Sequence, residues 1–280
     1  MTFGADVELA VFNVAVTDAR GRHVAGLTAR DFRIEEDGRP QAIALFDAGD
    51  LPASVGLIVD SSGSMLDKRT EVVNAALAFV TASNPEDEMF VINFNEHAYA
   101  GLPAPMAFTQ DPIVMRGALL RTPPAGYTAL YDALALGIEH LTAGTRTRKA
   151  LVVLSDGGDN ASRRSLDDVL REARRSSATI YTIGIYDETN LDSNPRVLRK
   201  IADVSGGRAY FPRALVDLDG VWRDVAGSIR GQYTIGYQST NTNRDGRFRR
   251  VTIRALQKGR GLRVTTRDGY VGPGIDSRGR

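Results

Sequence analysis

Three oxygen-bearing side chains stand at alternate positions in the segment DSSGS, namely Asp60, Ser62 and Ser64. This i, i+2, i+4 spacing lets one tight loop turn all three inward, and the intervening glycine relaxes the backbone restriction that such a loop meets. Thr128 in GYTAL and Asp156 in LSDGGD add two further oxygen donors. Hard oxygen ligands suit Mg²⁺, Mn²⁺ or Ca²⁺ and argue against zinc or copper.

The elements predicted around these residues bring them to one edge of a sheet. Strands are predicted at 55–60, 88–94, 149–155, 178–185 and 208–211, and helices at about 65–82, 112–120, 129–142, 165–176, 195–204 and 215–229. Nearly continuous apolar runs such as VGLIVD and KALVVLSD are typical of parallel strands that are covered on both faces. Asp60 and Asp156 close two such strands, and Thr128 stands at the entrance to a helix. We therefore expect all three at the carboxyl ends of the strands in an open parallel sheet.

Both ends of the chain have strand patterns instead. VELAVFNVAV and FRIEEDGRPQAIALF lie near the start, the latter with the form of two strands around a turn, and QYTIGYQST, RFRRVTIRAL and LRVTTR lie near the end. Each set is too short to bury a core alone, so we expect the two to join in one small β-sandwich. The predicted division is 1–52 and 230–271 for the β-sandwich, 53–229 for the inserted α/β domain, and 272–280 for a disordered tail.

The composition excludes several classes of protein. The chain has no cysteine, which removes disulfides, thiol nucleophiles, zinc–thiolate sites and iron–sulfur clusters. Its three histidines are too widely spaced to form a metal-ligand pattern. No apolar stretch approaches the roughly 18 residues that span a membrane. Residues 230–280 carry twelve Lys and Arg against three Asp and Glu, but arginines that alternate with apolar residues indicate the wet face of a strand rather than nucleic-acid binding.

The motif residues resemble a known family. DSSGS, Thr128 and Asp156 fit the pattern Asp-x-Ser-x-Ser, then Thr, then Asp of the metal-ion-dependent adhesion site in von Willebrand factor A-type domains. The resemblance covers about residues 53–229 and implies a Rossmann-like, doubly wound, mainly parallel sheet. The flanking segments resemble, more weakly, bacterial proteins in which such a domain sits beside β-strands.

The resemblance also implies a ligand set and a type of partner. Ser62, Ser64 and Thr128 would ligate the cation directly, and Asp60 and Asp156 directly or through water. Mg²⁺ is the expected ion, with Mn²⁺ or Ca²⁺ as alternatives. An Asp or Glu of a partner protein would complete the coordination, because neutral hydroxyls leave most of the cation's charge unquenched.

Other interpretations of the same residues stay open. Ser64 could cap a helix that starts near Met65, leaving DSSGS a plain turn in a scaffold domain. A Mg²⁺-dependent phosphoryl or ester hydrolase could use the two carboxylates. However, DSSGS is not a G-x-S-x-G elbow, no histidine is placed to activate Ser62, and no phosphate-binding glycine loop occurs. We therefore expect a binding module and not an enzyme.

Several residues near the motif have less specific expectations. Asp159 is predicted to be a loop or helix-cap residue rather than a second layer of the cation site. Tyr127 and the loop at 186–195 could line the rim of the site. Ser61, the middle serine of DSSGS, is predicted to be expendable for cation binding.

The start of the sequence bears on location. Its first 30 residues lack the basic start and apolar stretch of a signal peptide, so the protein is either cytoplasmic or exported with a leader that lies outside this sequence. Bacterial relatives with this layout are often exported, and by that analogy we expect an extracytoplasmic location.

Overall fold

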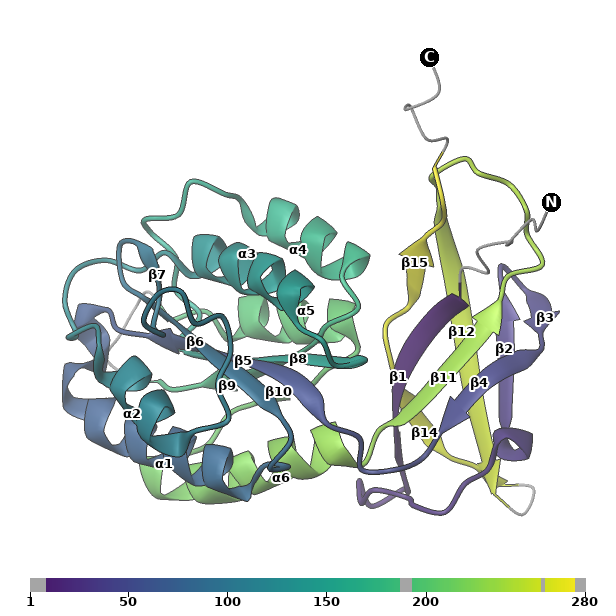
Figure 1. Ribbon diagram of the computed structural model, residues 1–280, viewed down its shortest axis with the longest axis horizontal. Coiled ribbons are helices and arrows are strands. Elements are labelled where there is room, and N and C mark those ends of the chain that lie inside the picture. Colours follow the sequence, from purple (N-terminus) through teal and green to yellow (C-terminus); the bar gives the residue numbers. More distant parts are fainter. Residues whose placement is uncertain (1–8, 187–192, 258–259, 275–280) are drawn as a thin grey trace. The chain divides into compact units, whose positions relative to one another are not determined.

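The computed structural model describes residues 9–186, 193–257 and 260–274. It divides the chain into two compact units (Figure 1). Asp50–Arg230 form the inserted unit, and the segments up to Gly49 and from Gly231 together form the terminal unit. The loop 187–192 and most of the predicted tail, residues 275–280, lie outside the described residues.

The inserted unit is built on a six-stranded sheet with the order β10-β9-β8-β5-β6-β7. The strands are β5 (Ala53–Asp60), β6 (Glu88–Phe94), β7 (Ala98–Ala100), β8 (Arg148–Ser155), β9 (Thr179–Gly184) and β10 (Ala209–Tyr210). All neighbours pair in parallel except β7, which forms an antiparallel edge on β6. The predicted doubly wound, mainly parallel sheet is confirmed. Because the chain leaves β5 first to one side and later continues on the other, its switch point lies at the carboxyl end of β5.

Helices cover both faces of this sheet (Figure 1). One layer contains α1 (Arg69–Ala82), α2 (Pro112–Leu120) and α6 (Leu218–Arg230), and the other contains α3 (Leu130–His140), α4 (Leu166–Arg175) and α5 (Pro195–Ser205). The helix predicted from residue 65 differs from the observed one, because Gly63–Lys68 form a 3₁₀ segment, η2, and α1 starts only at Arg69. The amide of Gly63 donates a hydrogen bond to Gly126 O at 3.2 Å. The start of this 3₁₀ segment is therefore bonded to the loop before Thr128 and not to the helix.

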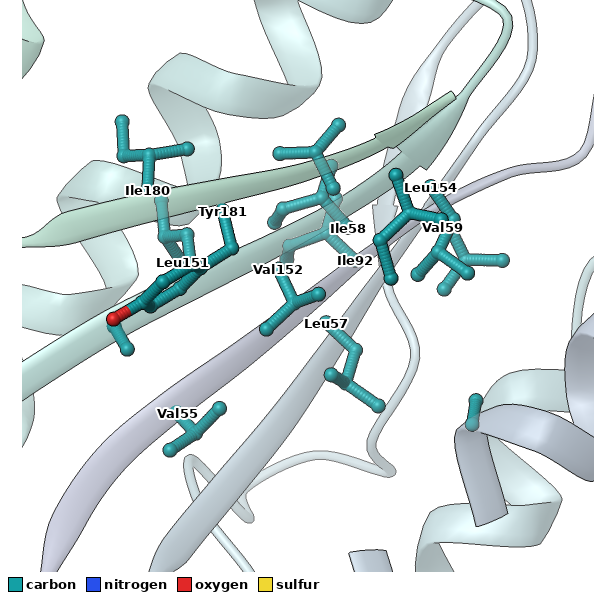
Figure 2. Packing of buried hydrophobic residues seen from close by; sticks show 14 of the residues in the cluster. Val55, Leu57, Ile58, Val59, Ile92, Leu151, Val152, Leu154, Ile180 and Tyr181 are labelled. Atoms are coloured by element: carbon teal, nitrogen blue, oxygen red, sulfur yellow. The ribbon is translucent and has the colours of Figure 1, made fainter. Parts of the chain in front are cut away.

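The core of the inserted unit explains the continuous apolar strands. Every residue of β5 is buried, and its side chains pack with those of β6, β8 and β9 (Figure 2). Burying one such Val, Leu or Ile side chain stabilises the fold by about 1.5–3 kcal/mol. Phe79 and Trp222 meet between α1 and α6 with ring centroids 4.7 Å apart. A rigid sheet therefore supports the loops at its carboxyl edge.

The terminal unit pairs strands from both ends of the chain. One sheet has the order β14-β1-β11-β4, and the other has the order β13-β12-β2-β3 with β15 also on β12. The strands are β1 (Leu9–Thr17), β2 (Phe32–Glu36), β3 (Arg39–Gln41), β4 (Ile43–Asp47), β11 (Tyr233–Gln238), β12 (Phe248–Gln257), β13 (Arg260–Gly261), β14 (Arg263–Thr265) and β15 (Gly269–Val271). One apolar cluster takes side chains from both sheets, including Phe12, Phe32, Tyr233 and Ile253.

The segment FRIEEDGRPQAIALF forms three strands where the sequence predicts two. Asp37 and Gly38 both have positive φ, 48° and 79°, which is the geometry of a two-residue hairpin turn between β2 and β3. After Gln41 the chain leaves that sheet, and β4 pairs with β11 in the other one. Strand periodicity is the same in both sheets, so it cannot reveal where a chain changes sheet.

A buried ionic cluster joins the two ends of the terminal unit. Glu36 is 2% exposed, and its Oε2 accepts hydrogen bonds from the hydroxyls of Tyr237 and Tyr270 at 2.7 and 2.8 Å. Its Oε1 accepts from Ser239 Oγ at 2.6 Å and lies 3.6 Å from Arg249 Nη1. The alternating arginines of β12 were predicted to face water, but Arg249 shares the buried register of Val251 and faces inward.

The described start of the predicted tail is hydrogen-bonded to the terminal unit. Gly272 N donates to Arg247 O at 2.9 Å, and Gly246 N donates to Pro273 O at 3.1 Å.

Candidate metal centre

Asp60 ends β5 at the switch point of the sheet and is fully buried. Its Oδ1 accepts a hydrogen bond from the amide of Ser62 at 2.9 Å, and its Oδ2 accepts one from Ser155 Oγ at 2.7 Å. Burial raises the pKa of Asp60 from 3.8 to about 6, the hydrogen bonds from Ser62 and Ser155 oppose that rise, and the charge of Asp156 adds to it. Asp60 therefore carries a charge that the protein itself solvates only in part.

Two serines of the motif meet Asp156 from the neighbouring strand. The hydroxyl oxygens of Ser62 and Ser64 lie 3.2 Å apart, and Ser64 Oγ donates to Asp156 Oδ2 at 3.3 Å. Asp156 Oδ1 accepts from the amide of Gly158 at 3.0 Å, which orients the carboxylate. The alternative role of Ser64 as a helix cap is wrong, because the residues that precede η2 and α1 are Ser62 and Lys68, and neither caps through its side chain.

A cavity of about 280 Å³ lies at this edge of the sheet. Four of the five predicted ligands line it, and the full set of lining residues is Ser62, Ser64, Gly126, Tyr127, Thr128, Asp156, Gly158 and Asn160. Asp60 does not line the cavity and instead lies behind Ser62 and Ser155. The structure thus places Asp60 one layer deeper than the other four.

Thr128 is held in place by Asn160, which the sequence reasoning missed. The amide of Thr128 donates to Asn160 Oδ1 at 2.8 Å, and the amide of Asn160 donates back to Thr128 O at 3.0 Å. This reciprocal pair fixes the Thr128 loop to the loop that carries Asp156. The available signal was the position of Asn160 four residues after Asp156, in a loop where asparagine favours local backbone hydrogen bonds.

Asp159 has the structural role that the sequence favoured. Its Oδ2 accepts from the amide of Tyr131 at 3.0 Å and from Ser162 Oγ at 2.6 Å, so it binds the first turn of α3. Burial raises the pKa of Asp159, and these hydrogen bonds partly offset the rise.

The rim of the cavity has one prominent side chain among the described residues that line it. Tyr127 is 65% exposed and follows Gly126, whose positive φ of 74° turns the chain toward Thr128. The predicted rim loop 186–195 lies largely outside the described residues, but at its end Asn194 N donates to Asp156 O at 2.9 Å.

The donor set fits a hard divalent cation. Within the described part of the chain, no group of three or more His, Cys, Asp or Glu side chains is placed to hold a metal ion. A cation in this cavity would instead be held by the hydroxyls of Ser62, Ser64 and Thr128 with the carboxylate of Asp156, and Asp60 would act from behind. Such oxygen ligands match Mg²⁺, Mn²⁺ or Ca²⁺.

No described helix is long and apolar enough to cross a membrane.

Known proteins share both the sequence pattern and the fold. Residues 54–219 match the family model of the von Willebrand factor type A domain. An uncharacterised protein of Synechocystis sp. is 29% identical over 167 residues, which are 58% of this chain. The matched region spans only 38% of that relative.

Solved structures agree on the fold at low sequence identity. A von Willebrand factor type A protein from Catenulispora acidiphila is 17% identical with a TM-score of 0.59, and the match covers 97% of this chain and 76% of that one. The corresponding domain of the type V pili tip protein Mfa5 from Porphyromonas gingivalis is 13% identical with a TM-score of 0.55, over 65% of this chain and 96% of that one.

A third solved structure bears on the choice of metal. Proximal thread matrix protein 1 from the mussel byssus is 16% identical with a TM-score of 0.57, over 71% of this chain and 50% of that one, and its adhesion motif is occupied by zinc. An oxygen-rich motif of this kind therefore does not by itself exclude zinc. The family model covers more than half of the sequence, and the chain belongs to the von Willebrand factor type A domain family.

Proposed function

We propose that this protein is a divalent-cation-dependent protein-binding module. The observation that carries the proposal is the cavity at the carboxyl end of β5, where three separate loops contribute Ser62 and Ser64, Thr128, and Asp156. Hydroxyls that converge on a solvent-open cavity beside a single lining carboxylate suit a cation that still has a free coordination position.

The ligand chemistry indicates the type of partner. When bound, the cation supplies a concentrated positive charge, and three of its four cavity ligands are neutral hydroxyls that offset little of it. An Asp or Glu side chain of a partner protein would be attracted to that charge and would complete the oxygen coordination. Asn160 and Gly158 orient Thr128 and Asp156, and buried Asp60 holds the amide of Ser62.

The relatives support an interaction role. Von Willebrand factor type A domains are commonly interaction modules, and those matched here include a pilus tip protein and a mussel byssus matrix protein. By analogy with the pilus tip protein, we propose a location outside the cytoplasm for this chain. We also propose that the two sheets of the terminal unit, which share one apolar core, form a small β-sandwich.

A hydrolase is the less supported alternative. Metal-assisted hydrolysis is commonly helped by a general base near the attacking water. None of the described residues that line the cavity is His, Lys or Glu. His140, for example, stacks on Phe90 with centroids 4.2 Å apart and bonds to Ala107 O at 2.7 Å. Asp156 is the one carboxylate among these lining residues, and the proposal assigns it to the cation rather than to a water.

The proposal is tested by thermal melts of the full chain in EDTA and with added Mg²⁺ or Mn²⁺. A ligand at 100 times its Kd stabilises the folded state by about 2.7 kcal/mol, so the melting temperature should rise by a few degrees. Asp156→Ala should abolish the rise, whereas Asp167→Ala, an exposed acid in the first turn of α4, should keep it. No shift with either metal would overturn the cation site.

The partner class needs its own measurement. If the wild type takes up Mn²⁺, titration with an Asp-containing peptide should strengthen Mn²⁺ binding, and the matched Asn peptide should not. Equal behaviour of the two peptides would rule out an acidic partner residue while leaving the cation site in place.

A further inference from the structure

Arg69, the first residue of α1, is a buried arginine directly behind the candidate cation site. It is 9% exposed, and its Nη1 donates to Ser61 Oγ at 2.9 Å. Its Nη2 donates to Thr122 O at 3.0 Å and also to Leu119 O. One guanidinium thus reaches the loop that carries Ser62 and Ser64 and the start of the loop that carries Thr128.

Ser61 uses every one of its polar groups in this arrangement. Its amide donates to Phe94 O at 2.6 Å, its carbonyl accepts from the amide of Ala125 at 2.9 Å, and its hydroxyl accepts from Arg69. Ser61 is also fully buried. The residue that the sequence treats as expendable is therefore the point at which the motif loop is joined to its surroundings.

The carbonyl partners of Arg69 belong to the carboxyl-terminal end of α2. Leu119 lies in the last turn of that helix and Thr122 just beyond it, where carbonyl groups lack partners within the helix. A planar guanidinium with several fixed donors can bind such carbonyls and a hydroxyl at once, which an ammonium group does less well. The segment from Thr122 to Thr128 is then tied at its start by Arg69 and at its end by Asn160.

Burying an arginine is costly unless its hydrogen bonds are well made. Desolvation lowers the pKa of Arg69, and the negative charge of Asp60 opposes that change. The fold thus accepts a buried cation next to a place where a second cation would bind.

We propose that Arg69 is a positioning residue of the cation site, which through Ser61 and the end of α2 sets the distance between the Ser62–Ser64 loop and the Thr128 loop. The inference rests on the proposed function, because it concerns the geometry of the same ligands. A purely structural role would stabilise the fold without affecting cation affinity or the order of these two loops.

Arg148 offers a matched control. It is also a buried arginine, 1% exposed, and its Nη1 donates to Arg230 O at 3.2 Å. It starts β8, whereas Asp156 follows the other end of the same strand. Arg148→Met should therefore destabilise the inserted unit without changing the cation site.

The experiment measures Mn²⁺ affinity of the full chain by calorimetry. Arg69→Met should weaken binding about 10- to 100-fold, the range typical when a group that orients metal ligands is lost. Arg69→Lys should recover part of the loss, Ser61→Ala should lose less than Arg69→Met, and Arg148→Met should bind as the wild type does. Equal affinity of Arg69→Met and the wild type would overturn the proposal, and if Arg69→Met does not fold, Arg69→Lys and Ser61→Ala decide by the same criterion.

Amide hydrogen exchange in EDTA provides a readout that needs no metal. Arg69→Met should speed exchange at the amides of Gly63 and Ala125, which join the two loops, by more than its loss of global stability accounts for, whereas Arg148→Met should speed it only by that amount. If the wild type binds no Mn²⁺, the proposed function fails. The exchange rates at these two amides then test by themselves whether Arg69 positions the two loops. Unchanged protection at both amides would then overturn its positioning role.

Discussion

Both units of the protein bury a carboxylate, but they treat it in different ways. In the terminal unit, Glu36 receives hydrogen bonds from three hydroxyls and lies beside Arg249. In the inserted unit, Asp60 receives hydrogen bonds from Ser62 and Ser155 and interacts with the charge of Arg69, and burial still raises its pKa to about 6. The first cluster is closed on itself, whereas the second lies behind a cavity lined by further oxygen atoms.

This difference shows which buried acids indicate a binding site. A buried acid with a full set of donors is part of the structure, because its charge is already compensated. A buried acid with few donors, next to converging hydroxyls and open space, is stabilised further when a cation arrives. Five variants test this difference between the two buried acids.

The largest effect is expected from ending the chain after Arg230. This truncation removes β11 and β12, and with them the strand partners of β1, β4 and β2. The apolar faces that carry Phe12 and Phe32 would be exposed, so the shortened protein should aggregate or lose a folding transition in calorimetry and size-exclusion chromatography. Full solubility with an unchanged melt would refute a shared β-sandwich core.

Glu36→Gln removes the compensating charge of the closed cluster. Arg249 would stay buried without its anionic partner, which costs about 3–5 kcal/mol. Urea denaturation should show that loss in the free energy of unfolding, while Mn²⁺ affinity stays the same. A loss of cation affinity would show that the two carboxylates are not independent.

The same acid-to-amide change at Asp60 should act in the opposite direction. Because the folded pKa is about 6 and the ordinary value is 3.8, the folded state binds the proton more tightly between these values. The contribution of Asp60 to metal-free stability should therefore fall as pH rises from about 4 to about 6, by up to about 3 kcal/mol, whereas acids with a lowered pKa, such as Asp31 and Asp168, contribute in the opposite direction. Asp60→Asn should remove this pH dependence and stabilise the EDTA-treated protein at pH 7.

Denaturation at several pH values in EDTA measures that change. A less stable Asp60→Asn protein at pH 7 would mean that Arg69 and the hydrogen bonds outweigh the cost of burying the charge. The cost of burying the Asp60 charge would then no longer distinguish it from Glu36.

The smallest effect compares one serine from each cluster. Ser64→Ala removes a cavity hydroxyl and should weaken Mn²⁺ binding about tenfold, which is about 1.4 kcal/mol, with little change in metal-free stability. Ser239→Ala removes a hydrogen bond to Glu36 and should lower stability by about 1.5 kcal/mol without changing Mn²⁺ affinity. Titration and urea denaturation of both variants check the pair, and a reversal of the two outcomes would contradict the comparison.

Local patterns were sufficient to predict much of the inserted unit. Apolar runs located β5 and β8, and the rule that parallel strands share a carboxyl edge placed Asp60, Thr128 and Asp156 in one region. The same rule does not say how deeply each of these residues is buried within that region. It therefore did not separate Asp60, which lies behind the cavity, from the four residues that line it.

Other features depend on contacts between distant segments. Arg69 and Arg249 have the sequence context of solvated residues, and only their tertiary partners make them buried. The alternation of inward and outward side chains along β12 contained a signal for Arg249, since it points to the same face as Val251. The 3₁₀ start before α1 also has a tertiary cause, because Gly63 is bonded to Gly126 across the site.

The pairing of β1 with β11 also has a consequence for biosynthesis. Leu9 pairs with Gln238 and Val14 with Tyr233, so β1 must wait for about 220 further residues to be translated. At about 5–20 residues per second, that delay is about 10–40 s. All of Asp50–Arg230 leaves the ribosome before the terminal unit can close. We therefore expect the inserted unit to fold first, with the early strands exposed to chaperones until the last fifth of the chain arrives.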